Sequence, residues 1–178
     1  MRRTIQIALC GLIAALSTTV MLIAGVVPVA SYALPALAGI FAMVIVIEMH
    51  IGWAFSVYAV TGALSLLIVP DKQAVLLYLF FFGYYPIIKA LLERIKFKII
   101  VYLLKFAVFN AAVIGAYFAA LWLLSVPEDA FVIFGVNLPW VLLILANAVF
   151  ILYDFALSGL VVNYFKRLHP IVKKLLQK

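Results

Sequence analysis

Six long apolar runs follow one another along this chain of 178 residues, and they constrain its fold more than any other feature. A helix needs about 20 mainly apolar residues to cross a hydrocarbon core of about 30 Å, because each residue advances it by about 1.5 Å. The runs predict transmembrane helices at residues 5–26, 29–47, 51–69, 74–92, 99–125 and 138–163. We therefore expect an all-α fold, in which residues 1–178 form one six-helix transmembrane domain with a basic C-terminal tail at 164–178.

The composition agrees with an integral membrane protein. Hydrophobic residues make up 70% of the chain and charged residues 11%, and the mean hydropathy is +1.32, whereas soluble domains carry about 25% charged residues. No linker rich in Pro, Gly or Ser and no repeat divides the chain, so one domain is expected. Arg2 and Arg3 precede the first run as in a secretion signal, but its length and the lack of a small-residue cleavage site predict a retained span.

The basic residues are sorted between the two sides of the predicted bundle. With the N-terminus in the cytoplasm, the outer connections receive only Lys72, whereas the cytoplasmic side receives Arg2, Arg3, Arg94, Lys96, Lys98, Lys166, Arg167, Lys173, Lys174 and Lys178. Basic residues that flank membrane spans are retained in the cytoplasm, so both termini are expected inside. The net charge of +7 then indicates contact with anionic lipid headgroups and not with nucleic acid.

The fourth run places polar and aromatic groups on one helical face. Steps of four, three and four residues predict a single stripe made of Tyr78, Phe82, Tyr85 and Lys89. Pro86 cannot donate to the carbonyl of Phe82, so we expect a kink that leaves this oxygen free for a partner inside the bundle. A packing role is the alternative, since tyrosines are common in membrane helices and Lys89 is near enough to the cytoplasmic end to reach water.

The last two runs carry a second set of polar groups. Trp140, Asn147 and Asp154 recur every seven residues in the sixth run, and Asn110 and Tyr117 show the same spacing in the fifth. An ionised carboxylate that faces lipid is costly, so such a group is expected to face a cavity or an opposite charge. Both faces are therefore predicted to point into the bundle.

Two roles remain open for these groups. Lys89 or Lys105 can pair with Asp154 in a salt bridge that only fixes helix packing. Alternatively the stripes line a solute pocket, in which aromatic rings hold a flat or apolar part of the solute and amides and phenols fix its orientation. The predicted substrate-binding residues are Tyr78, Tyr85, Lys89, Asn110, Tyr117, Trp140, Asn147 and Asp154.

The longest connection is "SVPEDAFVIFGVNLPW" at residues 125–140, on the predicted outer side. Its acidic pair, Glu128 and Asp129, is followed by aromatic residues. This pattern fits a short lid over the bundle, and it equally fits an acidic turn with aromatic anchors at the membrane interface.

The sequence does not favour an enzyme. Ser158 precedes a glycine inside a span, as in intramembrane serine proteases, but neither His50 nor His169 is expected at its depth. Glu48 and His50 do not form an HExxH zinc pattern, and no Asp-rich motif offers Mg²⁺ ligands. Cys10 has no cysteine partner, so we expect neither a disulfide nor a metal, and no cofactor.

The first run has a face of small residues. Ala8, Gly11 and Ala15 lie along one side of the predicted helix, and Gly11 and Ala15 show the small-xxx-small spacing of close helix contacts. Together with six spans, about 180 residues and a basic cytoplasmic side, this pattern resembles a substrate-binding S component of the bacterial energy-coupling factor transporters, which import vitamins and other micronutrients. The resemblance covers the whole chain, but it identifies no particular vitamin.

The resemblance implies a function and partners. It implies a multi-pass subunit of the bacterial cell membrane that captures a small solute near the outer side. It also implies that Ala8, Gly11 and Ala15 dock against a transmembrane coupling subunit with cytoplasmic ATPases, although alanine is more usual where Gly11 stands. The chain has no GxxxxGK[ST] motif, so an ATP-driven function needs a partner ATPase. The alternatives are an assembly factor without a ligand and a self-sufficient channel or secondary transporter.

Overall fold

The computed structural model describes residues 3–26, 30–124, 132–133, 136–170 and 172, and at 123–140 and 142 it describes no side chains. It is helical almost throughout, as the sequence predicts. The elements in chain order are α1 (Arg3–Ala24), α2 (Ala33–Glu48), α3 (Ile51–Ile68), α4 (Lys72–Leu77), the π-helix η2 (Tyr78–Phe82), α5 (Tyr85–Leu92), α6 (Lys98–Leu124), β1 (Val132–Ile133), β2 (Val136–Asn137) and α7 (Leu138–Arg167). The two strands form one short antiparallel pair, in which Val132 lies opposite Asn137.

Five helical segments of the described chain are long and apolar enough to cross a membrane: Arg3–Ala24, Ile51–Ile68, Lys72–Leu92, Lys98–Trp122 and Leu143–Arg167. The remaining apolar helix, α2, has 16 residues and is therefore about 24 Å long at about 1.5 Å per residue. This length is less than a full hydrocarbon core. Membrane association follows from the five segments, whereas the sixth crossing and the cytoplasmic orientation stay predictions.

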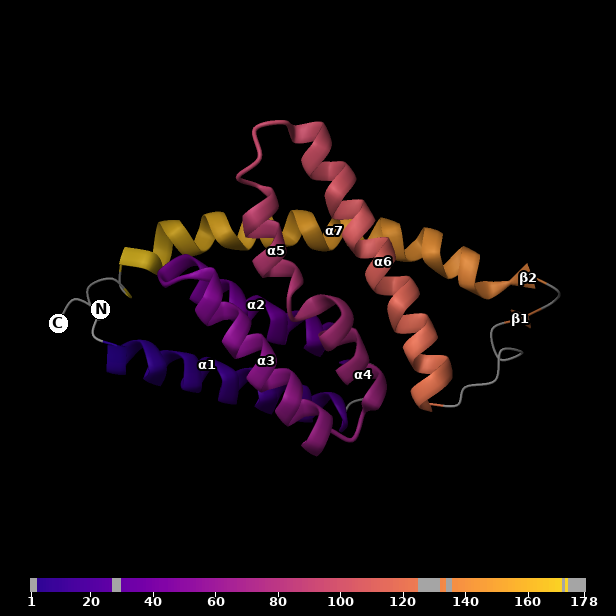
Figure 1. Ribbon diagram of the computed structural model, residues 1–178, viewed down its shortest axis with the longest axis horizontal. Coiled ribbons are helices and arrows are strands. Elements are labelled where there is room, and N and C mark those ends of the chain that lie inside the picture. Colours follow the sequence, from indigo (N-terminus) through magenta and orange to yellow (C-terminus); the bar gives the residue numbers. More distant parts are fainter. Residues whose placement is uncertain (1–2, 27–29, 125–131, 134–135, 171, 173–178) are drawn as a thin grey trace.

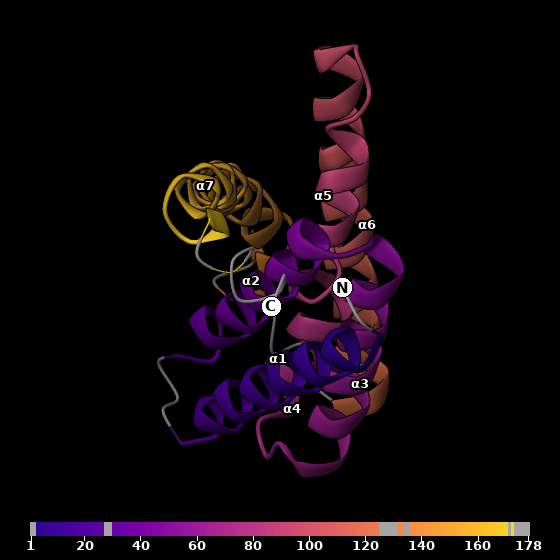
Figure 2. The ribbon, with the colours of Figure 1, turned by 90° about the vertical axis from the view of Figure 1, so that its left-hand side faces the viewer.

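The helices form two groups (Figure 1). α1, α2 and α3 pack together around two clusters of buried apolar side chains, which include Met21, Ala38, Ile45 and Val57. A third cluster joins η2 and α5 to α6 and α7 through Phe81, Phe109 and Phe150. In the view from the left-hand side of Figure 1, α7 lies at one side of the molecule. The C-terminal end of α5 and the N-terminal end of α6 project away from the other helices (Figure 2).

The helix between Lys72 and Leu92 is interrupted in its middle. The Gly83 N–H donates to the Tyr78 carbonyl at 2.8 Å, five residues back, which closes a π-turn. Two carbonyls beside this turn have partners on other helices: the Tyr58 hydroxyl donates to the Leu79 oxygen at 2.7 Å, and the Phe82 oxygen lies against Gly39 of α2. The Phe82 carbonyl, which cannot receive a bond from Pro86, therefore faces a helix inside the bundle, as expected from the sequence.

The π-turn divides the predicted stripe into two faces. Tyr78 is fully buried among α1 and α3 residues and its ring lies 5.9 Å from that of Tyr58. Tyr85 points to the other group of helices, where its ring lies 5.4 Å from that of Phe150. The prediction of one continuous face therefore holds for Tyr85 and Lys89 and fails for Tyr78, because a π-turn is wider than the α-helical turn that the spacing assumed.

The outward faces of α6 and α7 are apolar. Large side chains such as Leu103, Trp122, Leu152 and Phe155 are exposed there. A contiguous exposed apolar surface is unfavourable in water and favourable in lipid. These faces therefore fit contact with a bilayer.

Candidate functional site

A cluster of charges lies at the centre of the second helix group. Asp154 of α7 accepts hydrogen bonds at Oδ1 from the Tyr85 hydroxyl at 2.6 Å and from Lys89 Nζ at 2.5 Å, and at Oδ2 from Lys105 Nζ at 3.0 Å. Lys89 also donates to the Ser158 hydroxyl at 2.9 Å. The two lysines are almost completely buried, with side chains 4% and 5% exposed. Both lysines that the sequence offered as partners thus contact Asp154.

Glu93 completes the cluster. Its Oε1 lies 2.9 Å from both Lys89 Nζ and Lys105 Nζ, so two ammonium groups face two carboxylates and the charges balance. Burial raises the pKa of the Glu93 carboxyl, but hydrogen bonds from Lys105 and Lys89 outweigh burial and hold the pKa below its ordinary value of 4.5. Sequence reasoning missed Glu93, although its position four residues after Lys89 is the usual spacing for a helical ion pair.

Asn110 and Asn147 form a reciprocal pair between α6 and α7. The Nδ2 atom of each donates to the Oδ1 atom of the other at 3.0 Å. Each Nδ2 also donates to a carbonyl one turn back in its own helix, Phe106 or Leu143, at 2.8 Å. The two amides therefore use both of their N–H groups, and neither asparagine is among the described lining residues of the two cavities described below.

A large cavity lies between η2, α6 and α7. It has a volume of about 990 Å³ and is lined by the aromatic rings of Phe80, Phe81, Phe82, Phe109, Tyr117, Phe118, Phe150 and Tyr153, with small residues such as Ala112 and Ala146 between them. We call it the outer cavity, because it lies toward the predicted outer ends of these helices. Tyr117 is the one predicted substrate-binding residue among its described lining residues, and Phe82 of the predicted stripe also lines it.

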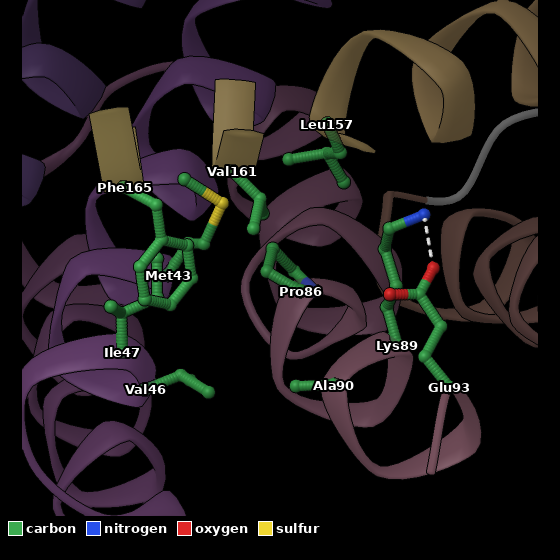
Figure 3. A pocket seen from close by; sticks show the side chains of 10 residues that line it. All are labelled: Met43, Val46, Ile47, Pro86, Lys89, Ala90, Glu93, Leu157, Val161 and Phe165. Atoms are coloured by element: carbon green, nitrogen blue, oxygen red, sulfur yellow. Dashed lines mark ion pairs between the residues drawn. The ribbon is translucent and has the colours of Figure 1, made fainter. Parts of the chain in front are cut away.

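A smaller cavity of about 300 Å³ lies one helical turn further along α5 and α7 (Figure 3). Its wall is mostly apolar and includes Met43 of α2 and Leu157 of α7. Lys89 and Glu93 form its polar side, and their ion pair is visible in Figure 3. We call it the inner cavity. The charge cluster therefore stands between the two cavities.

The remaining predicted residues are placed elsewhere. Tyr78 lies in the first helix group, and its hydroxyl has no hydrogen-bond partner within the described chain, as is also true of the buried hydroxyls of Thr61 and Ser65. The side chain of Trp140 lies outside the described residues, as does most of the connection predicted as a lid or an acidic turn. Their roles stay predictions.

A third polar contact holds the end of α7 to α2. Glu48 Oε1 accepts a hydrogen bond from the Tyr164 hydroxyl at 2.8 Å and lies 2.8 Å from His169 Nδ1. Ser158 and His169 were weighed as protease residues, but Ser158 bonds to Lys89 and His169 to Glu48. α7 is thus attached by polar groups at three depths, at Asn147, Asp154 and Tyr164.

The small residues of the first helix lie on its outer side. Ala8, Gly11 and Ala15 are all exposed, and a Cβ atom added at Gly11 would have nothing within 4 Å. Cys10 and Ala14, one position away, are buried and face α2 and α3. The predicted docking face is therefore exposed on the outside of the described bundle.

The part of the chain that the structure describes contains no group of three His, Cys, Asp or Glu side chains that could hold a metal ion. The features of the described chain that bear on function are the two cavities, the charge cluster and the exposed small-residue face of α1. A comparison of the chain with protein-family models, curated proteins and solved structures finds no match.

Proposed function

We propose that this chain is a membrane-embedded subunit that binds a small solute in the outer cavity and delivers it for uptake. The observation that carries the proposal is that cavity: about 990 Å³ in volume, with a wall of aromatic and aliphatic side chains contributed mainly by η2, α6 and α7. Ligand pockets are typically concave, mainly apolar and about 300 to 1,000 Å³ in volume. A pure assembly factor has no need of such a volume.

The free face of α1 supports the second half of the proposal, a partner that supplies energy. Thr4, Ala8, Gly11, Ala15 and Thr19 follow one another at helical spacing and are exposed. Small residues let the backbone of another helix approach closely in a membrane. Such a partner, with its own ATPases, is what the resemblance to S components of bacterial energy-coupling factor transporters implies. The proposed location is the bacterial cell membrane.

One observation favours a second candidate, a self-sufficient transporter. The inner cavity shares α7 with the outer cavity, and Lys89 of the Lys89–Asp154 pair lines it. Two cavities separated by a charged layer resemble the two halves of a translocation path, in which intramembrane charges mark the route. This candidate needs no coupling subunit.

Native mass spectrometry of gently purified protein tests the proposal. We expect a retained small molecule in the wild-type protein. Ala146→Trp fills the outer cavity and should remove that molecule, whereas Ala148→Trp places the same ring on the exposed face of the same helix and should not. Copurified ATPase subunits would favour the coupled uptake subunit, and a lone protein that transports solute in vesicles would favour the second candidate. Equal retention in both variants would contradict a solute site in the outer cavity.

A further inference from the structure

The outer cavity is a crevice between α6 and α7 with a closed end near the middle of the bundle. At that end the rings of Phe109 and Phe150 stack with centroids 4.5 Å apart, and the Asn110–Asn147 pair ties the two helices together. Beyond this point α6 and α7 diverge, toward the right of Figure 1. The crevice therefore widens toward the predicted outer ends of both helices.

The sides of the crevice open laterally. Ile114 and Phe118 of α6 and Leu145 and Val149 of α7 line the cavity, yet they are 46%, 61%, 57% and 62% exposed. Both helices belong to segments long and apolar enough to cross a membrane, so this rim lies at the depth of lipid chains and not of bulk water. A ligand dissolved in the bilayer can enter between these four side chains.

The wall of the crevice does not suit an ionised ligand. Among its described lining residues there is no Asp, Glu, Lys or Arg, and the only side-chain polar groups are tyrosine hydroxyls. The charges on the next turn of α7 are already paired with each other, since Asp154 contacts both Lys89 and Lys105. An ionised group inside the crevice would find no opposite charge among the described lining residues, and a buried charge without a partner is strongly disfavoured.

From these three observations we infer the class of the solute and its route. The outer cavity takes an uncharged, largely apolar molecule with a flat ring system, which enters sideways from the bilayer between α6 and α7. Flat rings suit the wall because the cavity is lined by partly exposed aromatic side chains, Phe80, Phe82, Tyr117 and Phe118, which can contact a ligand ring by its face or edge. This inference rests on the proposed function and adds the chemistry of the solute.

Photolabelling of the whole protein in lipid nanodiscs tests the inference with two matched probes. Benzophenone is uncharged and 4-benzoylbenzoate carries one negative charge, and light attaches either probe to nearby C–H bonds. We expect benzophenone to label the cavity wall saturably and at least about tenfold more than 4-benzoylbenzoate, as measured by peptide mass spectrometry. Ala146→Trp should abolish the saturable labelling, and Ala148→Trp should leave it unchanged.

The outcomes separate this inference from the proposed function. If the charged probe labels the wall as strongly as benzophenone and Ala146→Trp removes both signals, the cavity binds solutes but the inferred class is wrong. If neither probe labels the wall saturably, or Ala146→Trp changes nothing, the outer cavity is not a solute site and both proposals fail. A cross-link from the wall to another protein chain would show that a partner helix fills the crevice, which also overturns the inference.

Discussion

A Cβ atom placed on Gly39 would overlap the carbonyl oxygen of Phe82, so the backbones of α2 and η2 are in direct contact. This contact faces the carbonyl that Pro86 leaves without an intrahelical donor, and a Cα–H group can contact such an oxygen favourably. Gly39 is therefore the residue of α2 that allows the irregular helix at Tyr78–Phe82 to pack in backbone contact.

Gly39→Ala should destabilise the protein. The added methyl group meets backbone and not a flexible side chain, so the helices have to separate, and overpacking typically costs about 1 to 3 kcal/mol. Thermal unfolding in detergent measures the loss. Gly52→Ala is the matched control, because its Cβ would have nothing within 4 Å, and it should be neutral or stabilising by up to about 1 kcal/mol. Equal stability of the two variants would contradict the contact.

Asp154→Asn should lower stability more than it lowers affinity for a solute. The substitution leaves Lys89 and Lys105 with one carboxylate, Glu93, and removal of one partner from a buried ion pair costs about 3 to 5 kcal/mol. Combining it with Lys105→Met restores the balance of charge and should recover part of the loss. A variant with unchanged thermal stability but weakened solute binding would assign Asp154 to the solute site instead.

Glu93 should make the stability of the protein depend on acid pH. Because its pKa is lowered in the folded protein, its ion pairs contribute fully above the ordinary pKa of 4.5, and this contribution is lost as pH falls through the lowered folded value. Unfolding temperature measured from pH 7 down to pH 3 should therefore fall less steeply in Glu93→Gln than in the wild type. Parallel curves would show that Glu93 adds no stability.

Substitution on the free face of α1 should block a partner without unfolding the chain. Gly11→Leu or Ala15→Leu adds a branched side chain at an exposed position of α1, so the isolated protein should remain folded and keep its ligand. Copurification of the coupling subunit should be lost. Gly159→Leu, at an equally open glycine on α7, is the control and should still copurify. Retention of the partner by both α1 variants would move the docking face elsewhere.

The orientation predicted from the basic residues can be checked by cysteine labelling. In a Cys10→Ala background, a cysteine at Gln73 should react with an impermeant maleimide on intact cells, because Gln73 is exposed at the start of α4 on the predicted outer side. A cysteine at Lys96, exposed between α5 and α6, should react only after the cells are opened. The reverse pattern would invert the topology and remove the support for an outer solute site.

Periodicity anticipated the polar contacts of α7 well. The seven-residue spacing of Asn147 and Asp154 placed both on one face, and the structure pairs them with Asn110 and with the two lysines. The four-residue spacing of Tyr85 and Lys89 also predicted one shared face, and both side chains donate to Asp154. These predictions succeed because a polar side chain in an apolar membrane helix is stabilised mainly by contact with another polar group.

The rest depended on features that periodicity does not encode. The π-turn at Tyr78–Phe82, where the Tyr58 hydroxyl donates to the Leu79 carbonyl, departs from the 3.6-residue period of an α-helix, so the direction of Tyr78 was predicted wrongly. The outer cavity depends on the divergence of α6 and α7, and apart from Phe82 its phenylalanines have no spacing in the sequence that distinguishes them from core residues. α2 also begins at Ala33, four residues after the start of the apolar run, and is shorter than predicted.

The π-turn has a consequence for how this helix could have arisen and how it can be altered. A π-turn holds one residue more than the α-helical turn it replaces, so deletion of a single residue within Tyr78–Phe82 would restore a regular helix and rotate everything beyond it by about 100°. Tyr85 and Lys89 would then swing away from Asp154, while Tyr78 kept its place beside Tyr58. The additional residue of the π-turn thus sets the rotation of α5, which bears Lys89 of the charge cluster, relative to α4, which packs in the first helix group.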